Sequence, residues 1–240
     1  MNGEYFHVRQ GDVRGDSLVL RDEEFSHCIR VLRKKPGDHI WVSDGDDTMF
    51  EVMITKVRKD SVEGTILGTT MRHGEPKVDI TLALSLLKNP SRVEVVVEKA
   101  TELGVRSIIP LHCERTIPRH ERHERLEKIA LAAMKQCGRS HLPSIYALTD
   151  FRALVEHAGE YSLRLLPHEK TEQSHFLGSV LAHHAKAKSV LVAIGPEGGF
   201  SEQELESAIA RGFVPVSLGP RRLRSDTAAI SALSWIVGEW

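Results

Sequence analysis

From residue 78 onward, apolar runs alternate with helical patterns, and this alternation restricts the fold more than any other feature of the chain. Val78–Leu87 is a nearly continuous apolar run, as is typical of a strand buried on both faces of a parallel sheet. Asn89-Pro90 then begins a segment with apolar residues at helical spacing, and Gly104 follows where helices favour glycine. Such repeated units predict an α/β domain with a parallel sheet.

The same alternation continues to the C-terminus. Four more strands are expected, at Ser107–Leu111, Leu163–Leu166, Ser189–Ile194 and Val214–Leu218. Three more helices are expected: Glu121–Cys137, a segment that starts after Ser201 and ends at Gly212, and a segment from about Asp226 to the end. The first serine of Ser201-Glu-Gln-Glu204 and the glutamate three residues later form the pattern of a capping box.

Residues 1–72 have a different pattern of apolar and polar residues, which indicates a separate β-rich domain. Apolar and polar residues alternate across residues 39–67 between turn signals such as Asp44-Gly45, and short strands at this spacing predict a small barrel or sandwich. A helix is expected from Asp22 to Lys35, ended by Pro36-Gly37. The polar segment Thr69–Lys77 is the expected linker, so the predicted domains are residues 1–72 and 73–240.

Composition predicts a cytoplasmic protein. No apolar run approaches the ~20 residues needed to span a bilayer, and the N-terminus lacks the apolar core of a signal peptide. Three scattered cysteines do not form a disulfide framework or a CxxC metal motif. The many histidines, such as His120 and His183, have no carboxylate at ligand spacing. We therefore expect neither a membrane segment nor a bound metal.

The net charge of −1 bears on nucleic-acid binding. Nucleic-acid-binding proteins usually carry an excess of Lys and Arg, so this balance argues against RNA as a partner. A neutral total can still conceal a basic face, and the balance therefore leaves such a function open.

Two loops stand out as candidates for a ligand site, Ile194–Phe200 (IGPEGGF) and Ser217–Ala228 (SLGPRRLRSDTA). Both follow predicted strands, and open α/β sheets bind ligands at the carboxyl ends of their strands. Their glycines allow sharp turns and a close approach to the backbone. A tight connection without a ligand, or a phosphate site at a helix N-terminus, would also explain such a loop.

Neither loop matches the GxGxxG fingerprint of dinucleotide-binding proteins or the P-loop. The first strand of the α/β domain leads into Lys88-Asn-Pro-Ser91, which has no glycine. An ordinary open-sheet methyltransferase would be expected to carry its glycines there. The candidate ligand site therefore lies in the last third of the chain.

Four motifs resemble those of one family. IGPEGGFSEQE and SLGPRRLRSDTAAISAL resemble two signature loops of the 16S ribosomal RNA uridine-N3-methyltransferases (the RsmE family), in the knotted SPOUT class. KNPSRVEVVVEKATELGVRSIIP resembles the central pattern of the family, and His27-Cys-Ile-Arg-Val-Leu-Arg33 resembles its HxxxVLR signature. The chain departs from the family at Asp226, where glutamate is usual, and at Cys137, where serine is usual.

The resemblance implies a specific architecture: a PUA-like small β-barrel domain, then a SPOUT α/β domain with a parallel sheet and a C-terminal trefoil knot. Nothing in the periodicity itself shows the knot. The resemblance also implies a homodimer, with the final helix and the helix near Ser91 as candidate contacts that would equally suit the core. The implied cofactor is S-adenosylmethionine, and its implied contacts are Leu166, His168, Ile194, Gly195, Pro196, Glu197, Gly198, Gly199, Leu218, Gly219, Leu223, Arg224, Thr227 and Ala228.

The chemistry of methylation at uracil N3 suggests roles for three of the charged residues. A permanently protonated arginine is a poor base but a good partner for charge that grows on the uracil oxygens. Arg224 is the candidate for this role, although an ion pair with Asp226 or Glu197 would also explain it. Glu197 and Asp226 are candidate bases, and the sequence does not choose between them.

For RNA, the candidates are basic residues within the signature segments, each of which would also suit a solvated surface charge. They are Arg30, Arg33, Lys34, Lys35, Arg92, Arg115, Arg119 and Arg139. The predicted partner is ribosomal RNA within the small ribosomal subunit. The alternative functions are a non-catalytic RNA-binding assembly factor with a residual cofactor pocket and an enzyme that acts on a free nucleotide.

Overall fold

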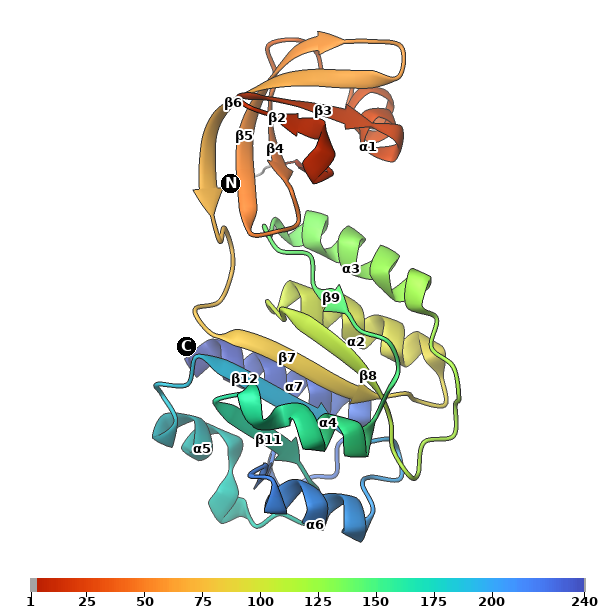
Figure 1. The fold of residues 1–240 in the computed structure, drawn as a ribbon, viewed down its shortest axis with the longest axis vertical. Helices are drawn as coiled ribbons and strands as arrows, with labels where there is room; N and C mark the ends of the chain where they lie inside the picture. The colour runs from red at the N-terminus through yellow and green to blue at the C-terminus, as the bar shows by residue number, and fades with distance from the viewer. Residues whose placement is uncertain (1–3, 240) are drawn as a thin grey trace. The chain divides into compact units, whose positions relative to one another are not determined.

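The computed structural model describes residues 4–239 and divides them into two compact units (Figure 1). The first unit contains the residues up to Glu75 and also Leu131–Leu142; the second contains Pro76–Ala130 and the residues from Pro143 onward. Helix α3 (His123–Cys137) therefore contributes to both. A division at residue 72 does not anticipate this returning segment, because an amphipathic pattern does not show which core a helix serves.

The first unit is a six-stranded sheet in the order β1-β4-β5-β6-β3-β2. The strands are β1 (Tyr5–His7), β2 (Val13–Arg14), β3 (Ser17–Arg21), β4 (His39–Ser43), β5 (Thr48–Val57) and β6 (Ser61–Met71). All neighbours are antiparallel except β1 and β4. Two register shifts between β5 and β6 bend the long hairpin around a core that includes Phe6, Leu20 and Val52. The prediction of a β-rich domain is confirmed.

One prediction about the first unit is wrong. The helix expected over Asp22–Lys35 is only α1 (Asp22–Ser26) followed by a π-helical turn (His27–Val31), and the chain then turns at Arg33 with φ of 55°. The expected linker, Thr69–Lys77, does contain the boundary between the two units, which falls between Glu75 and Pro76, although β6 runs to Met71 and the Glu75 side chain is 2% exposed.

The second unit is a seven-stranded sheet in which every paired strand is parallel, as predicted. The order is β10-β8-β7-β12-β11-β13, with β9 beside β8. The strands are β7 (Asp79–Ser85), β8 (Ser107–His112), β9 (Ser144–Ile145), β10 (Thr149–Asp150), β11 (Leu163–Pro167), β12 (Ser189–Ile194) and β13 (Val214–Val216). The sequence did not reveal β9 and β10, which are only two residues long.

The helices of this unit are α2 (Pro90–Glu102), α4 (Phe151–His157), α5 (Leu177–His183), α6 (Glu202–Ala210) and α7 (Ser225–Glu239). The sequence predicted α2, α6 and α7 but not the short helices α4 and α5. Asn89 caps α2 by accepting from Ser91 N. Ser201 and Glu204 form the predicted capping box at α6. Short 3-10 turns, Gln10–Asp12 in the first unit and Ala158–Glu160 and Gln173–His175 in the second, complete the elements.

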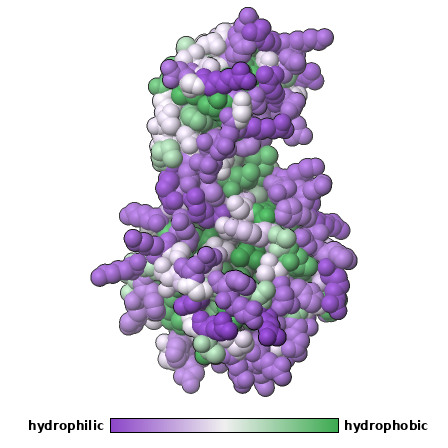
Figure 2. Space-filling model, in the orientation of Figure 1, coloured by the Kyte–Doolittle hydropathy of each residue, from purple (hydrophilic) through white to green (hydrophobic). Residues whose placement is uncertain are grey.

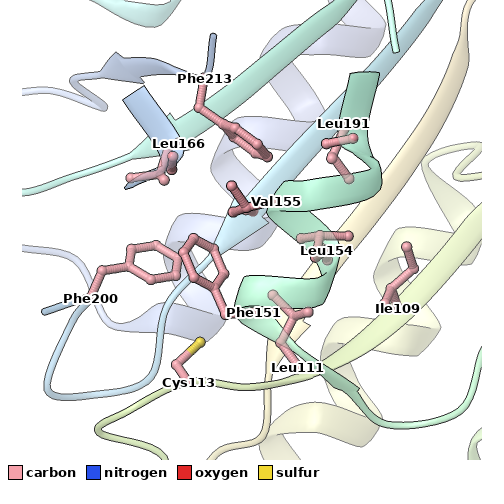
Figure 3. Packing of buried hydrophobic residues seen from close by; sticks show 14 residues of the cluster. Ile109, Leu111, Cys113, Phe151, Leu154, Val155, Leu166, Leu191, Phe200 and Phe213 are labelled. Atoms are coloured by element: carbon pink, nitrogen blue, oxygen red, sulfur yellow. The ribbon is translucent and has the colours of Figure 1, made fainter. Parts of the chain in front are cut away.

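Helix α4 anchors one end of the glycine-rich loop. Its Phe151 ring lies 4.7 Å from the ring of Phe200, centroid to centroid, within a buried cluster that also contains Leu154, Val155 and Phe213 (Figure 3). Phe200 is the last residue of IGPEGGF, so the loop that begins at the end of β12 returns directly to the core.

Hydrophilic side chains cover most of the visible surface of each unit, with small apolar areas between them (Figure 2). None of the helices within residues 4–239 is long and apolar enough to cross a bilayer. Among the exposed large apolar side chains are Val95 on α2, at 47%, and Trp235 on α7, at 40%.

Candidate active site

A pocket of about 1150 Å³ lies at the carboxyl ends of β12, β11 and β13, three neighbouring strands of the sheet. Three loops line most of it: 167–172 after β11, 194–202 after β12 and 217–225 after β13. Two of these are the loops that the sequence selected, and they do meet around one cavity. Arg92 on α2 and Arg115 complete the basic part of the lining.

Most of the predicted cofactor contacts lie in this lining. Those that do are His168, Ile194, Gly195, Pro196, Glu197, Gly198, Gly199, Leu218, Gly219, Leu223, Arg224 and Ala228. Leu166 and Thr227 are not part of the lining. The Leu166 side chain is fully buried in the core cluster instead, while Thr227 is exposed on α7.

Two glycines are required by the backbone itself. Gly199 has φ of 69° and Gly219 has φ of 113°, conformations that residues with a Cβ rarely adopt. One lies in each predicted loop. These positions allow each chain to turn back sharply beside the pocket, with no side chain between the backbone and a ligand.

The carboxylates expected near the reaction have partners of their own. Glu197 Oε1 accepts a hydrogen bond of 2.9 Å from the backbone nitrogen of Lys88, in the loop after β7. Asp226 Oδ2 lies 3.8 Å from Nε of Arg92 and is not part of the lining. Glu197 therefore connects two strand-end loops, and Asp226 connects the starts of α7 and α2.

Arg224 differs from Glu197 and Asp226, whose side chains have partners. It lines the pocket, it is exposed, and within residues 4–239 its side chain forms no hydrogen bond or ion pair. Its carbonyl accepts from Ala228 N at 2.7 Å, which fixes its backbone at the first turn of α7. The alternative explanation, an ion pair with Asp226 or Glu197, is therefore wrong for this structure. The guanidinium is free to contact a substrate.

His168 follows β11 at the edge of the pocket. Burial lowers the pKa of this side chain from its usual value, so the ring is mostly neutral at pH 7. Its Nδ1 accepts from Lys170 N at 3.4 Å, which leaves Nε2 as the protonated nitrogen.

The lining also explains how a chain of net charge −1 presents a basic site. It contains six basic side chains, Arg92, Arg115, Lys170, Arg221, Arg222 and Arg224. Its four acidic side chains are Glu169, Glu172, Glu197 and Glu202. Of these, Glu169 accepts from Arg222 Nε at 2.8 Å.

Sequence reasoning missed residues 169–172 and His175 in the lining. The only signal was that they follow a predicted strand. In the sheet, β11 lies between β12 and β13, and the sequence does not reveal this order.

The predicted RNA-binding residues occupy different environments. Arg30, Arg33 and Lys35 are exposed near the π-helical turn of the first unit, whereas Lys34 pairs with Glu4 at 2.5 Å. In the second unit, Arg119 is exposed beside His112. Arg92 contacts Asp226, and Arg115 donates to the Gly198 carbonyl.

Arg139 is not an RNA contact, and this prediction is wrong. Its side chain is 3% exposed and pairs with Glu75, itself 2% exposed, at 2.5 Å between Nη2 and Oε2. Nε of Arg139 is 3.1 Å from both Glu75 oxygens. The arginine lies in the interior of the first unit because the returning segment Leu131–Leu142 packs there.

Within residues 4–239, one group of three side chains has the composition of a metal site: Asp46, Asp47 and His141. It belongs to the first unit and includes no residue of the pocket. His141 Nδ1 lies 3.4 Å from Asp47 Oδ1, so two of the three side chains already contact each other.

Comparisons with known proteins agree with this geometry. A family model described as an RNA methyltransferase domain matches residues 74–237, and one described as an RNA methyltransferase PUA domain matches residues 20–67. Together with the parallel sheet and its strand-end pocket, these matches define the chain as an RNA methyltransferase with a PUA-like N-terminal domain.

Individual relatives are more specific. Ribosomal RNA small subunit methyltransferase E of Synechocystis is 34% identical over 92% of this chain and 72% of its own length. The Bacillus subtilis protein of that name is 28% identical, over 92% and 89%. The Neisseria gonorrhoeae protein of that name, solved with bound S-adenosylmethionine, superposes with a TM-score of 0.86 at 28% identity over 100% of this chain and 98% of its own. The chain belongs to the ribosomal RNA small subunit methyltransferase E family.

Proposed function

We propose that the protein transfers a methyl group from S-adenosylmethionine to N3 of a specific uridine in 16S ribosomal RNA. The observation that carries the proposal is the pocket formed by three strand-end loops, with the free guanidinium of Arg224 in its lining. At about 1150 Å³ the pocket is larger than most small-molecule sites. This volume leaves room for a uracil base beside the cofactor. The relative from Neisseria gonorrhoeae was solved with S-adenosylmethionine bound to it.

The sulfonium of the bound cofactor supplies an activated methyl group. The protein must then align the donor with the nucleophile and stabilise charge. In this proposal, backbone groups of loops 194–199 and 217–220, which line the pocket, hold the cofactor. As N3 attacks the methyl group its proton must pass to a base, for which Glu197, Asp226 and water are the candidates, and negative charge grows on the neighbouring carbonyl oxygens. Arg224 is placed to stabilise that charge with its two-pronged donor.

The test of the whole proposal is direct. Ribosomal RNA from cells that lack the gene should lose one methylated uridine in the 16S molecule, and purified protein with S-adenosylmethionine should restore it, as mapped by mass spectrometry. RNA binding without any methyl transfer would favour the alternative of a non-catalytic assembly factor.

Glu197→Gln distinguishes a base from a structural residue. The amide oxygen of glutamine can still accept from Lys88 N, but the side chain no longer binds a proton. We expect less than a fivefold change in the single-turnover rate, because the 2.9 Å hydrogen bond already assigns this carboxylate to the loop. A loss within the ~10²–10⁴ range of general base catalysis would instead identify Glu197 as the base.

We propose that residues 1–72 recognise RNA and that residues 73–240 carry the transferase, with Leu131–Leu142 packed on the first unit. Because removal of the N-terminal residues would strip this segment of its packing, point substitutions are the better test. In the triple variant Arg30→Ala, Arg33→Ala and Lys35→Ala, RNA affinity should fall and the salt slope should decrease by ~0.7–0.9 for each lost phosphate contact.

Affinity for S-adenosylmethionine should stay within twofold of wild type in this triple variant, as measured by calorimetry, since all three residues lie outside the pocket lining. RNA affinity and salt slope both equal to those of the unmodified protein would remove the exposed turn of the first unit from the recognition surface.

We propose three further features that the family resemblance implies. The first is a trefoil knot in the C-terminal part of the second unit. The second is a homodimer, for which the exposed Val95 of α2 and Trp235 of α7 offer apolar contacts on two helices that pack together. The third is ribosomal RNA within the small ribosomal subunit as the partner, in the cytoplasm. Sedimentation of the purified protein tests the dimer.

A further inference from the structure

We propose that Arg115 is a positioning residue that holds the glycine-rich loop 195–199 in its cofactor-binding conformation, and that it does not bind RNA. The inference rests on the proposed function, because it assigns the cofactor to the pocket that this loop lines. It concerns a residue outside the two signature loops, supplied by the segment that follows β8.

The contact between Arg115 and the loop has two parts. Nη1 of Arg115 donates to the carbonyl of Gly198 at 2.8 Å. The aliphatic stem lies against the same residue, since a Cβ on Gly198 would come within 3.3 Å of Arg115 Cδ and 3.4 Å of its Cβ. The arginine therefore contacts the loop through both its charged end and its stem.

The backbone at Arg115 is itself fixed. Thr116 Oγ1 accepts from Cys113 N at 2.9 Å and shares a 2.7 Å hydrogen bond with Ser85 Oγ, and both hydroxyls are buried. These bonds join the turn at 113–116 to strand β7. The arginine side chain thus extends from a rigid support.

A second connection runs from the same turn to the end of the loop. Glu114 N donates to Glu204 Oε1 at 2.8 Å, and Glu204 Oε2 accepts from Ser201 N at 2.9 Å. One carboxylate therefore joins the turn to the helix cap that follows the loop. In the loop after β7, Lys88 N donates to Glu197 Oε1.

The loop needs such support because of its composition. Gly195, Gly198 and Gly199 leave its backbone with more accessible conformations than other residues would, and a ligand must offset the entropy of ordering them. Because Arg115 is exposed, its charged hydrogen bond contributes at the low end for bonds of this kind, and we expect its loss to weaken the affinity about tenfold.

The test uses the full-length protein and calorimetric titration with S-adenosylmethionine. Arg115→Ala should weaken the affinity about tenfold, and Arg115→Lys, which keeps one donor, should restore part of it. The matched control is Arg152→Ala on α4, where the exposed arginine side chain pairs with Glu156 of the same helix; the cofactor affinity of this variant should equal that of wild type.

Two further readouts separate positioning from RNA binding. In Arg115→Ala, KM for S-adenosylmethionine should rise about tenfold, while kcat at saturating cofactor, the RNA dissociation constant and its salt slope should stay within about twofold. Unchanged cofactor affinity would overturn the proposal, and a concurrent loss of RNA affinity would return Arg115 to the RNA surface. If the wild-type protein itself did not bind the cofactor, the proposed function would fail instead.

A second variant covers the case in which Arg115→Ala folds poorly. Gly198→Ala has no positive φ to oppose it, but its Cβ presses on the Arg115 stem. It should weaken cofactor binding in the wild-type background. A cofactor affinity equal to that of wild type would overturn the proposal on its own.

Discussion

Replacing Arg224 with alanine is expected to lower kcat and kcat/KM together by ~10²–10³, the usual effect of removing one group that stabilises charge in a transition state. The structure strengthens this expectation, because the side chain lines the pocket and has no ion pair with Asp226 or Glu197, which contact Arg92 and Lys88 instead. Cofactor affinity and melting temperature should change little.

Single-turnover methylation at saturating cofactor and RNA is the deciding measurement for Arg224. Lysine at this position should recover only part of the rate, since it keeps the charge but loses the planar two-pronged geometry. A rate for Arg224→Ala within about twofold of wild type would show that this arginine takes no part in the chemistry.

Replacing Glu75 with alanine is expected to destabilise the protein by ~3–5 kcal/mol, because it removes the carboxylate that pairs with the buried guanidinium of Arg139. The same change removes one acceptor of the backbone nitrogens of Ser140 and His141, which donate to Glu75 Oε1 at 3.1 and 3.0 Å; Ser140 N also donates to the His73 carbonyl at 3.0 Å. These bonds hold the returning segment on the first unit. Urea and thermal unfolding, followed by a probe in that unit, measure the loss.

Two control variants test whether the loss of stability comes from the buried ion pair. The double variant Glu75→Leu with Arg139→Met removes both charges at similar volume and should cost less than the single change. Arg152→Ala, which breaks an exposed ion pair within one helix, should change stability by less than ~1 kcal/mol. If Glu75→Ala cost no more than this surface control, the buried pair would not hold Leu131–Leu142 in place.

Most of the α/β unit was predictable from local pattern. Val78–Leu87, Asn89-Pro90 and the Ser201 capping box predicted β7, α2 and α6, because burial on both faces, helix caps and helical periodicity are local properties. The helix expected over Asp22–Lys35 was not found at that length, since a π-helical turn and a positive φ at Arg33 depend on packing around Phe25 and Cys28.

The sequence by itself determined the family, the parallel sheet and the two glycine-rich loops that carry the pocket, because glycines, caps and apolar runs act over a few residues. Tertiary structure alone decided which loops meet, since the order β12-β11-β13 brings a third loop, 168–172, into the lining. The tertiary structure alone also distinguished three of the arginines from one another. Arg224, Arg115 and Arg139 look alike in the chain, yet one is free, one holds a loop and one is buried, because partners such as Gly198 and Glu75 lie more than sixty residues away and only the folded chain brings them together.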